Sequence, residues 1–293
     1  MDNNRITLKI SFSLKLLFFI SNFLICFFFT AIVYSLLANK FGTPDWVILS
    51  QVTLQNIVSF SLPAVVLAAF ITGNPFKYLG MNVAPKAKEL LFVLLLYIAS
   101  IPVMNLIIYL NSNVAFPDSL SAVEQILRNY EEAAQAVTDQ LISGQSFMGI
   151  CVLILTVGCL TGMGEEIFFR GMLTRLFIDK PLNKHLSIWL GAIIFSFMHF
   201  QFFGFVPRVL LGAMFGYLMV WTGCLWIPIF AHALNNSVAI IANHLFENKV
   251  IENKIDVIGT PESLLWLSVI SAIAVYLLLH NRHKFIQKRQ TTE

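Results

Sequence analysis

Charged residues are scarce in this chain. Only 12% of its 293 residues are Asp, Glu, Lys or Arg, whereas 57% are hydrophobic. A typical soluble domain carries roughly 25% charged residues. So few charges cannot cover the surface of a water-soluble fold, which excludes a soluble enzyme and a disordered chain. The net charge of +3 is too small to indicate binding to nucleic acid.

Several familiar motifs are also absent. The chain has no Cys-x-x-Cys pair, no His-Glu-x-x-His helix, no Gly-x-Ser-x-Gly elbow and no glycine-rich phosphate loop. The missing His-Glu-x-x-His excludes a zincin-type helix, and the missing Gly-x-Ser-x-Gly disfavours a serine hydrolase. The four cysteines, Cys26, Cys151, Cys159 and Cys224, are scattered in or beside apolar runs. We therefore interpret them as packing residues.

What the chain has instead is long apolar runs, each close to the roughly 20 residues that a membrane-spanning helix needs. They predict an all-α fold, a polytopic membrane helical bundle of about eight transmembrane helices. The runs cover 16–38, 54–72, 90–111, 150–177, 187–203, 207–222, 225–246 and 263–280.

The distribution of basic residues in the short loops predicts the orientation. Of the 19 Lys and Arg residues, the loops on one side of such a bundle hold only Lys40, Arg128, Arg208, Lys249 and Lys254. Most of the others fall on the side that carries both termini, and the positive-inside rule places that side in the cytoplasm. We therefore expect an integral cell-membrane protein with both termini cytoplasmic. The basic stretch 280–289 is expected to bind anionic membrane lipid.

The longest loop, 112–149, carries apolar residues at helical spacing. This pattern predicts an amphipathic helix that rests on the outer leaflet or caps the bundle, and a gate over a substrate entrance is the alternative. Ser121 and Glu124 have the spacing of a capping box at its start.

Three of the predicted spans contain polar residues, which are costly in lipid. The fourth holds Glu165, Glu166 and Arg170. Glu166 and Arg170 are one turn apart and can pair, whereas Glu165 points about 140° away from Arg170 and needs a partner on another helix. The alternative is a helix that stops at Met163 and is followed by a charged turn. The apolar residues that continue to Phe177 argue against it.

The fifth span contains Phe195 and His199, and the seventh contains His232 and Asn236, each pair one turn apart. At 1.5 Å per residue, Glu165 lies roughly 18 Å, His199 roughly 20 Å, His232 roughly 10 Å and Asn236 roughly 16 Å from the cytoplasmic helix ends. These side chains can share one layer. A packed histidine or an interhelical hydrogen bond is the alternative for each pair taken singly.

A carboxylate beside histidines in a buried polar site can activate water, and histidine or asparagine donors can stabilise an oxyanion. This set predicts hydrolysis, with an amide as the favoured bond. The same set, Glu165, His199 and His232, could instead bind a divalent metal such as zinc. A transporter is a further alternative, but it would require polar residues along a path through the membrane.

The three polar segments resemble the CPBP family of intramembrane proteases, which includes type II CAAX prenyl endopeptidases, bacteriocin-processing and immunity proteins and lysostaphin-resistance-protein-like proteins. The family pattern is Glu-Glu-x-x-x-Arg, then Phe-x-x-x-His, then His-x-x-x-Asn. Its counterparts here are Glu165, Glu166, Arg170, Phe195, His199, His232 and Asn236. The resemblance covers roughly 145–246. It divides the chain into a membrane framework (1–145), a catalytic core (146–246) and a last helix with a basic tail (247–293).

The resemblance implies an intramembrane endopeptidase in which Glu165 activates water with the help of His199. His232 and Asn236 would stabilise the oxyanion, with Glu166, Arg170 and Phe195 in support. The implied substrate is a peptide or membrane protein, with a lipid-modified one as a family possibility. Because the family has been described both as metalloproteases and as glutamate-dependent proteases, the metal stays open. A non-catalytic bacteriocin-immunity or membrane-partner protein is the alternative function.

Overall fold

The computed structural model describes residues 11–179, 182–251 and 255–286. These residues form helices, turns and loops and contain no strand, which confirms the predicted all-α class. Each of the eight apolar runs becomes a helix. Their bounds are α1 Phe12–Phe41; α2 Asp45–Leu54, continued by the π-helix η1 Gln55–Ser61 and by α3 Leu62–Thr72; α5 Ala87–Ser112; the continuous helix Phe147–Asp179; α10 Lys184–Phe197; α11 Phe205–Thr222; α12 Trp226–Glu247; and α13 Trp266–His280.

Five helical segments are long and apolar enough to cross a membrane: Phe12–Phe41, Asp45–Thr72, Ala87–Ser112, Phe147–Asp179 and Phe202–Thr222. The last of them is α11 together with the short 3₁₀-helix η5, Phe202–Gly204, that precedes it. Two more, α10 and α13, are apolar but shorter. α12 has 22 residues and is long enough to cross a membrane. It is not among the five because its His and Asn residues lower its mean hydropathy. Large apolar side chains such as Leu17, Ile25 and Leu36 are exposed along α1, as expected of a helix that faces lipid. The chain is therefore an integral membrane protein.

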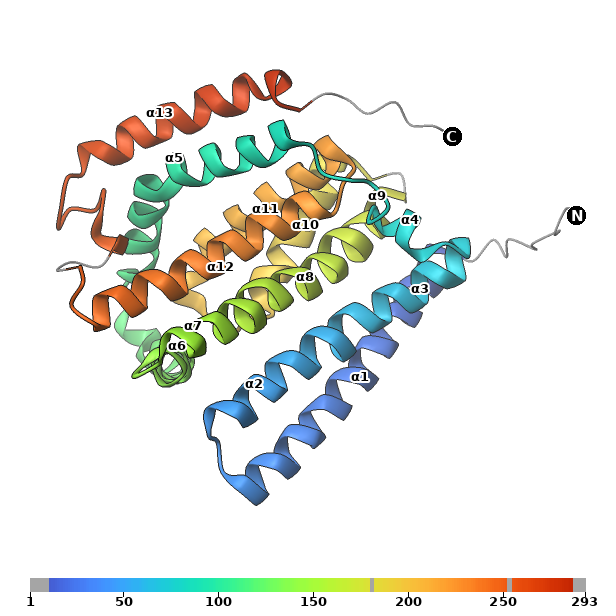
Figure 1. Cartoon of the computed structure of the whole chain (residues 1–293), viewed down its shortest axis with the longest axis horizontal. Coiled ribbons are helices and arrows are strands. Elements are labelled where there is room, and N and C mark those ends of the chain that lie inside the picture. The colour runs from blue at the N-terminus through green and yellow to red at the C-terminus, as the bar shows by residue number, and fades with distance from the viewer. Residues whose placement is uncertain (1–10, 180–181, 252–254, 287–293) are drawn as a thin grey trace, which may run out of the picture.

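The helices form a bundle with two outer pairs and an inner group (Figure 1). α1 lies beside α2 and α3 at one edge, and α5 lies beside α13 at the opposite edge. The continuous helix 147–179 lies between these pairs with α10, α11 and α12. α1 begins and α13 ends on the same side of the bundle, as an even number of crossings requires. Which side is cytoplasmic stays a prediction.

Aromatic side chains pack the framework against the inner group. Phe168 lies between Phe19 of α1 and Phe60 of η1, with ring centroids 4.6 and 5.3 Å away. Van der Waals contacts of this kind are one of the forces that hold helices together inside a membrane. The short helix α4 (Pro75–Leu79) adds a polar contact, because the Tyr78 hydroxyl donates to Asp179 Oδ2 at 2.8 Å.

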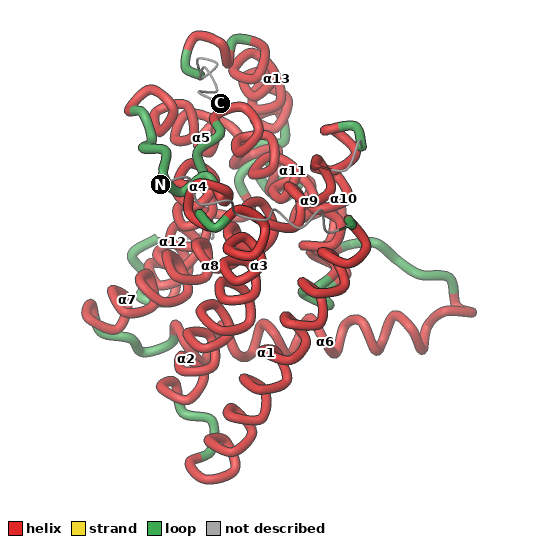
Figure 2. The backbone as a smooth tube through the Cα atoms, turned by 90° about the vertical axis from the view of Figure 1, so that its right-hand side faces the viewer, coloured by secondary structure: helices red, strands yellow, loops and turns green. Residues whose placement is uncertain are grey.

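The predicted amphipathic helix is α6, Ser121–Ile142. It lies crosswise to the bundle helices (Figure 2). The capping box predicted at its start is wrong. Ser121 is already the first helical residue, so its hydroxyl does not cap the helix, and Glu124 pairs with Arg128 at 2.6 Å instead. α6 contacts the loop after α10, where Gln201 Nε2 donates to Glu131 Oε1 at 3.3 Å.

Candidate active site

The segment that carries Glu165 is one unbroken helix. It is composed of α7 Phe147–Leu153, the π-helix η3 Ile154–Leu160, α8 Thr161–Glu166, the π-helix η4 Ile167–Leu173 and α9 Thr174–Asp179. It does not stop at Met163, so the alternative of a charged turn is wrong. Glu165, Glu166 and Arg170 are all buried, with 8%, 0% and 2% of their surfaces exposed. Burial of three ionisable groups is tolerated only with specific partners.

Two glycines bring this helix close to α12. A Cβ at Gly158 would meet Ser237 Oγ at 2.6 Å, and one at Gly162 would lie 3.0 Å from the Ala233 backbone nitrogen. Small residues four apart let two membrane helices approach at their backbones. This approach places His232 beside the two glutamates.

Glu166 is the centre of the charged cluster. Its Oε1 accepts from Arg170 Nη1 at 2.6 Å and from His232 Nδ1 at 2.8 Å. Arg170 Nη2 also donates to the Gly212 carbonyl at 3.0 Å, and its guanidinium lies 4.5 Å from the Phe195 ring centroid. The predicted pairing of Glu166 and Arg170 is therefore present. Charge-assisted hydrogen bonds of this kind are about twice as strong as neutral ones.

Glu165 finds its partner on another helix. Its Oε2 lies 3.6 Å from His232 Nε2. Among the described residues this buried oxygen accepts no hydrogen bond. The neighbouring carboxylates of Glu165 and Glu166 thus approach the two nitrogens of one imidazole ring. Glu166 Oε2 also has no donor among the described residues, so Glu165 is distinguished by its contact with His232 Nε2, the ring nitrogen that Glu166 does not bind.

His199 lies in a turn, so the helix predicted to reach residue 203 was too long. α10 ends at Phe197, and the chain reverses at Phe200, whose φ is +55°. A positive φ cannot continue a right-handed helix. His199 Nδ1 still lies 2.9 Å from the Phe195 carbonyl oxygen. Because a carbonyl only accepts, Nδ1 is the donor, which leaves Nε2 of the neutral ring to accept a proton.

Asn236 lies one turn after His232 on α12. Its Nδ2 donates to the Val157 carbonyl at 3.3 Å, and its Oδ1 accepts from Asn235 Nδ2 at 3.3 Å. The side chain is half-buried. These two contacts orient the amide, and its second N–H stays available as a donor.

A cavity of about 270 Å³ joins three of the four predicted catalytic residues. His199, His232 and Asn236 line it together with Phe195, Phe215 and Arg208, among others. Glu165 is not a lining residue, so the gathering predicted from helix depth is only partly present. In this conformation the Glu165 carboxylate lies next to His232, and His232 in turn lines the cavity.

Four features of this site were not predicted from the sequence. Phe215 stacks on the His232 ring with centroids 5.1 Å apart, and the Gly212 carbonyl binds Arg170. Arg208 was counted among loop residues, yet it lines the cavity. Asn56 of η1 donates to Thr161 Oγ1 at 3.1 Å, beside the glutamates. Of these four features, only the contact of Asn56 has a signal in the sequence. Asn56 lies inside an apolar run, and a polar residue in a membrane span needs a partner.

The close contact at Gly164 gives a test of this packing. A Cβ there would lie 2.7 Å from Asn56 Oδ1 and 2.8 Å from the Asn56 backbone oxygen. Because the backbone cannot move aside cheaply, Gly164→Ala should destabilise the protein by about 1–3 kcal/mol. Thermal unfolding of the purified protein measures this loss. The matched control is Gly149→Ala, where the nearest atoms belong to the flexible Gln145 side chain. Equal melting temperatures for the two variants would contradict the predicted contact.

Glu165, His199 and His232, the three residues predicted as alternative zinc ligands, are not arranged as a metal centre in this conformation. Within the described ranges, no three His, Cys, Asp or Glu side chains are arranged to hold a metal ion. Both nitrogens of His232 face carboxylates, and His199 Nδ1 is bound to a carbonyl. The zinc alternative with Glu165, His199 and His232 stays a prediction.

Residues 147–238 match the family model of the type II CAAX prenyl endopeptidases, described as Rce1-like. The match confirms the family resemblance drawn from the three motifs, all of which lie inside it. It falls within the predicted core 146–246 and covers α7 to the middle of α12.

One curated relative is the Uncharacterized protein YpbD of Bacillus subtilis (strain 168). It is 28% identical over 106 residues, which are 35% of this chain and 49% of YpbD. The chain therefore spans about half the length of that relative. No solved structure shows a significant match.

Proposed function

We propose that this protein is an intramembrane endopeptidase that hydrolyses a peptide bond with water activated by Glu165. The observation that carries the proposal is the contact of the buried Glu165 with His232. Glu165 Oε2 has no donor among the described residues and lies 3.6 Å from His232 Nε2, and His232 lines a cavity together with His199 and Asn236. A carboxylate oxygen without a donor, held beside a histidine, is placed to accept a proton from a water molecule. The Rce1-like match supports the same reaction class.

The cluster of Glu165, Glu166, Arg170 and His232 explains how the oxyanion is stabilised. The proposed mechanism requires a proton on both ring nitrogens of His232, and the positive charges of this ring and Arg170 then balance the two carboxylates. His232 Nδ1 then donates to Glu166, and its Nε2–H is available to the oxyanion that forms when water attacks the carbonyl. Asn236 supplies a second donor through its remaining N–H.

Proton transfer completes the proposed cycle. Glu165, aided by the free Nε2 of His199, takes a proton from the attacking water. The same proton is delivered to the leaving amine when the tetrahedral intermediate collapses, so the protein is restored after each turnover. Because Glu165 does not line the cavity, its side chain or His232 must shift when substrate binds.

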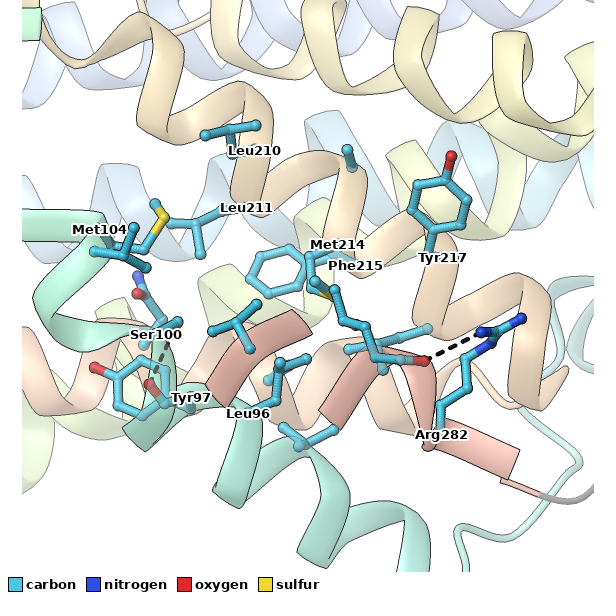
Figure 3. Close-up of a pocket in the computed structure, with 18 of the residues that line it drawn as sticks. Leu96, Tyr97, Ser100, Met104, Leu210, Leu211, Met214, Phe215, Tyr217 and Arg282 are labelled. Atoms are coloured by element: carbon cyan, nitrogen blue, oxygen red, sulfur yellow. Dashed lines mark hydrogen bonds between the residues drawn. The ribbon is translucent and has the colours of Figure 1, made fainter. Parts of the chain in front are cut away.

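The surroundings of the cavity support a membrane-associated substrate. Leu211, Phe215 and Asn235 line the 270 Å³ cavity and also a larger apolar cavity of about 550 Å³. Figure 3 shows this second cavity, with Leu96 and Tyr97 on one wall and Leu210 and Met214 on the other. It can hold the apolar part of a substrate, either side chains or an attached lipid. The substrate is accordingly a peptide or membrane protein, and a lipid-modified one suits this cavity.

Comparison of membrane-protein termini in cells tests the function and finds the substrate. Cells with the wild-type protein should contain new termini that disappear in cells with Glu165→Ala at equal protein abundance. A biological effect of the protein that persists in the Glu165→Ala, His199→Ala double variant, with no change in termini, would instead favour a non-catalytic membrane partner.

Metal removal distinguishes the two mechanisms. Because the catalytic cycle proposed here uses only side chains, dialysis of the purified protein against a strong chelator should leave the cleavage rate unchanged. Cleavage of a reporter peptide before and after dialysis measures this. Loss of activity that zinc restores would show that Glu165, His199 and His232 rearrange around a metal.

A further inference from the structure

One arginine and no lysine of the described residues line the candidate catalytic cavity. The arginine is Arg208, in the first turns of α11. The other residues that line this cavity are two histidines, two asparagines and apolar residues. Nothing in the proposed cleavage cycle uses this guanidinium.

The hydrogen bonds of Arg208 leave most of its donors unused. Nη1 donates to the Gln201 carbonyl at 3.3 Å and Nη2 donates to Gln201 Oε1 at 3.0 Å. Both acceptors are neutral, and no carboxylate of the described residues forms a direct ion pair with this guanidinium. Glu131 and Glu165 interact with its charge from a greater distance. A guanidinium has five N–H donors. Arg170, by contrast, is held by the Glu166 carboxylate and the Gly212 carbonyl.

Neighbouring residues hold the guanidinium in place. The Gln201 amide oxygen faces Arg208, while its Nε2 donates to Glu131 Oε1 on α6 at 3.3 Å. Gly204 makes room for it, because a Cβ there would lie 2.6 Å from Arg208 Nη2. A half-buried, oriented cation at the edge of a cavity is prepared for an anionic group that arrives with the ligand.

We propose that Arg208 is a specificity-determining residue that binds a carboxylate of the peptide substrate close to the scissile bond. This inference rests on the proposed peptidase function. A guanidinium binds a carboxylate through two parallel hydrogen bonds, and a sheltered cavity strengthens the attraction. The carboxylate can be the C-terminus of the peptide or an acidic side chain, and these two sources are chemically distinguishable. Arg208 touches the substrate in this role and leaves the reacting atoms to the other residues.

The test uses the purified full-length protein and quenched-fluorescent peptides in matched pairs. One arm compares a free C-terminal carboxylate with the carboxamide, and the other compares Glu with Gln after the scissile bond. In at least one arm, wild-type kcat/KM should favour the carboxylate by about 10- to 100-fold, as for a hydrogen bond to a charged group. Arg208→Gln should reduce that ratio to near one, and Arg208→Lys should keep part of it.

The ratio of the two kcat/KM values distinguishes recognition of a substrate carboxylate from a general electrostatic effect of Arg208. If Arg208 only balanced the charge of Glu165, its loss would slow both members of a pair equally and leave the ratio unchanged. Because both peptides are measured on one preparation, partial unfolding does not alter the ratio. Arg128→Gln is the matched control, since Arg128 lies on α6 outside the cavity lining. Equal wild-type cleavage of both members in both arms, or an unchanged ratio in Arg208→Gln, would overturn the inference and leave the peptidase function standing. No cleavage of any peptide by the wild type would remove the proposed function and the inference with it.

Discussion

Glu165→Gln should reduce kcat by about 10²- to 10⁴-fold, the usual contribution of a general base. The amide has nearly the same shape as the carboxylate but cannot take a proton from water. Because Glu165 Oε2 accepts no hydrogen bond among the described residues, the change should leave the fold intact. Single-turnover cleavage of a reporter peptide by the purified variant measures the effect, and its melting temperature checks the fold.

The control for this substitution is Glu132→Gln, which makes the same chemical change at an exposed position of α6. It should retain wild-type kcat and melting temperature. Retention of cleavage by Glu165→Gln at the wild-type rate would end the assignment of Glu165 as the base. A variant that unfolds would instead show that Glu165 contributes to the charge balance of the cluster more than to the chemistry.

The sequence was sufficient for the local features of this protein. All eight helices follow from runs of apolar residues, because the cost of exposing backbone groups to lipid leaves a membrane segment little choice but to form a helix. The contact of Glu166 with Arg170 follows from spacing alone, since residues four apart share a helix face. The partner of Glu165 on another helix followed from the same geometry, although not its identity as His232.

Contacts between distant segments could not be predicted from spacing. The approach of η3 and α8 to α12 depends on Gly158 and Gly162, which lie against Ser237 and Ala233. A single sequence does not say which helix a glycine faces. The position of His199 depends on the turn at Phe200. The entry of Arg208 into the cavity depends on how the loop after α10 packs beneath α6. Each is a tertiary contact, and hydropathy contains no information about it.

The ion pair of Arg170 and Glu166 should have the largest effect on stability. Both side chains are almost fully buried, and Glu166 Oε1 is shared with His232. Arg170→Met removes the cation and leaves a carboxylate without its main partner inside the bundle. Breaking a buried pair in this way costs about 3–5 kcal/mol. The free energy of unfolding, measured by denaturant titration in detergent, should fall by that amount.

The double variant Arg170→Met, Glu166→Gln identifies the cause of this loss. If an uncompensated charge is responsible, removing the carboxylate as well should recover part of the stability, so that the double variant loses less than the sum of the two single variants. His232 should retain a hydrogen bond to the new amide oxygen at position 166 in that background, which limits the damage to the site. Strictly additive losses would show that Arg170 acts through its contacts with Phe195 and the Gly212 carbonyl, and that the charge pairing contributes nothing.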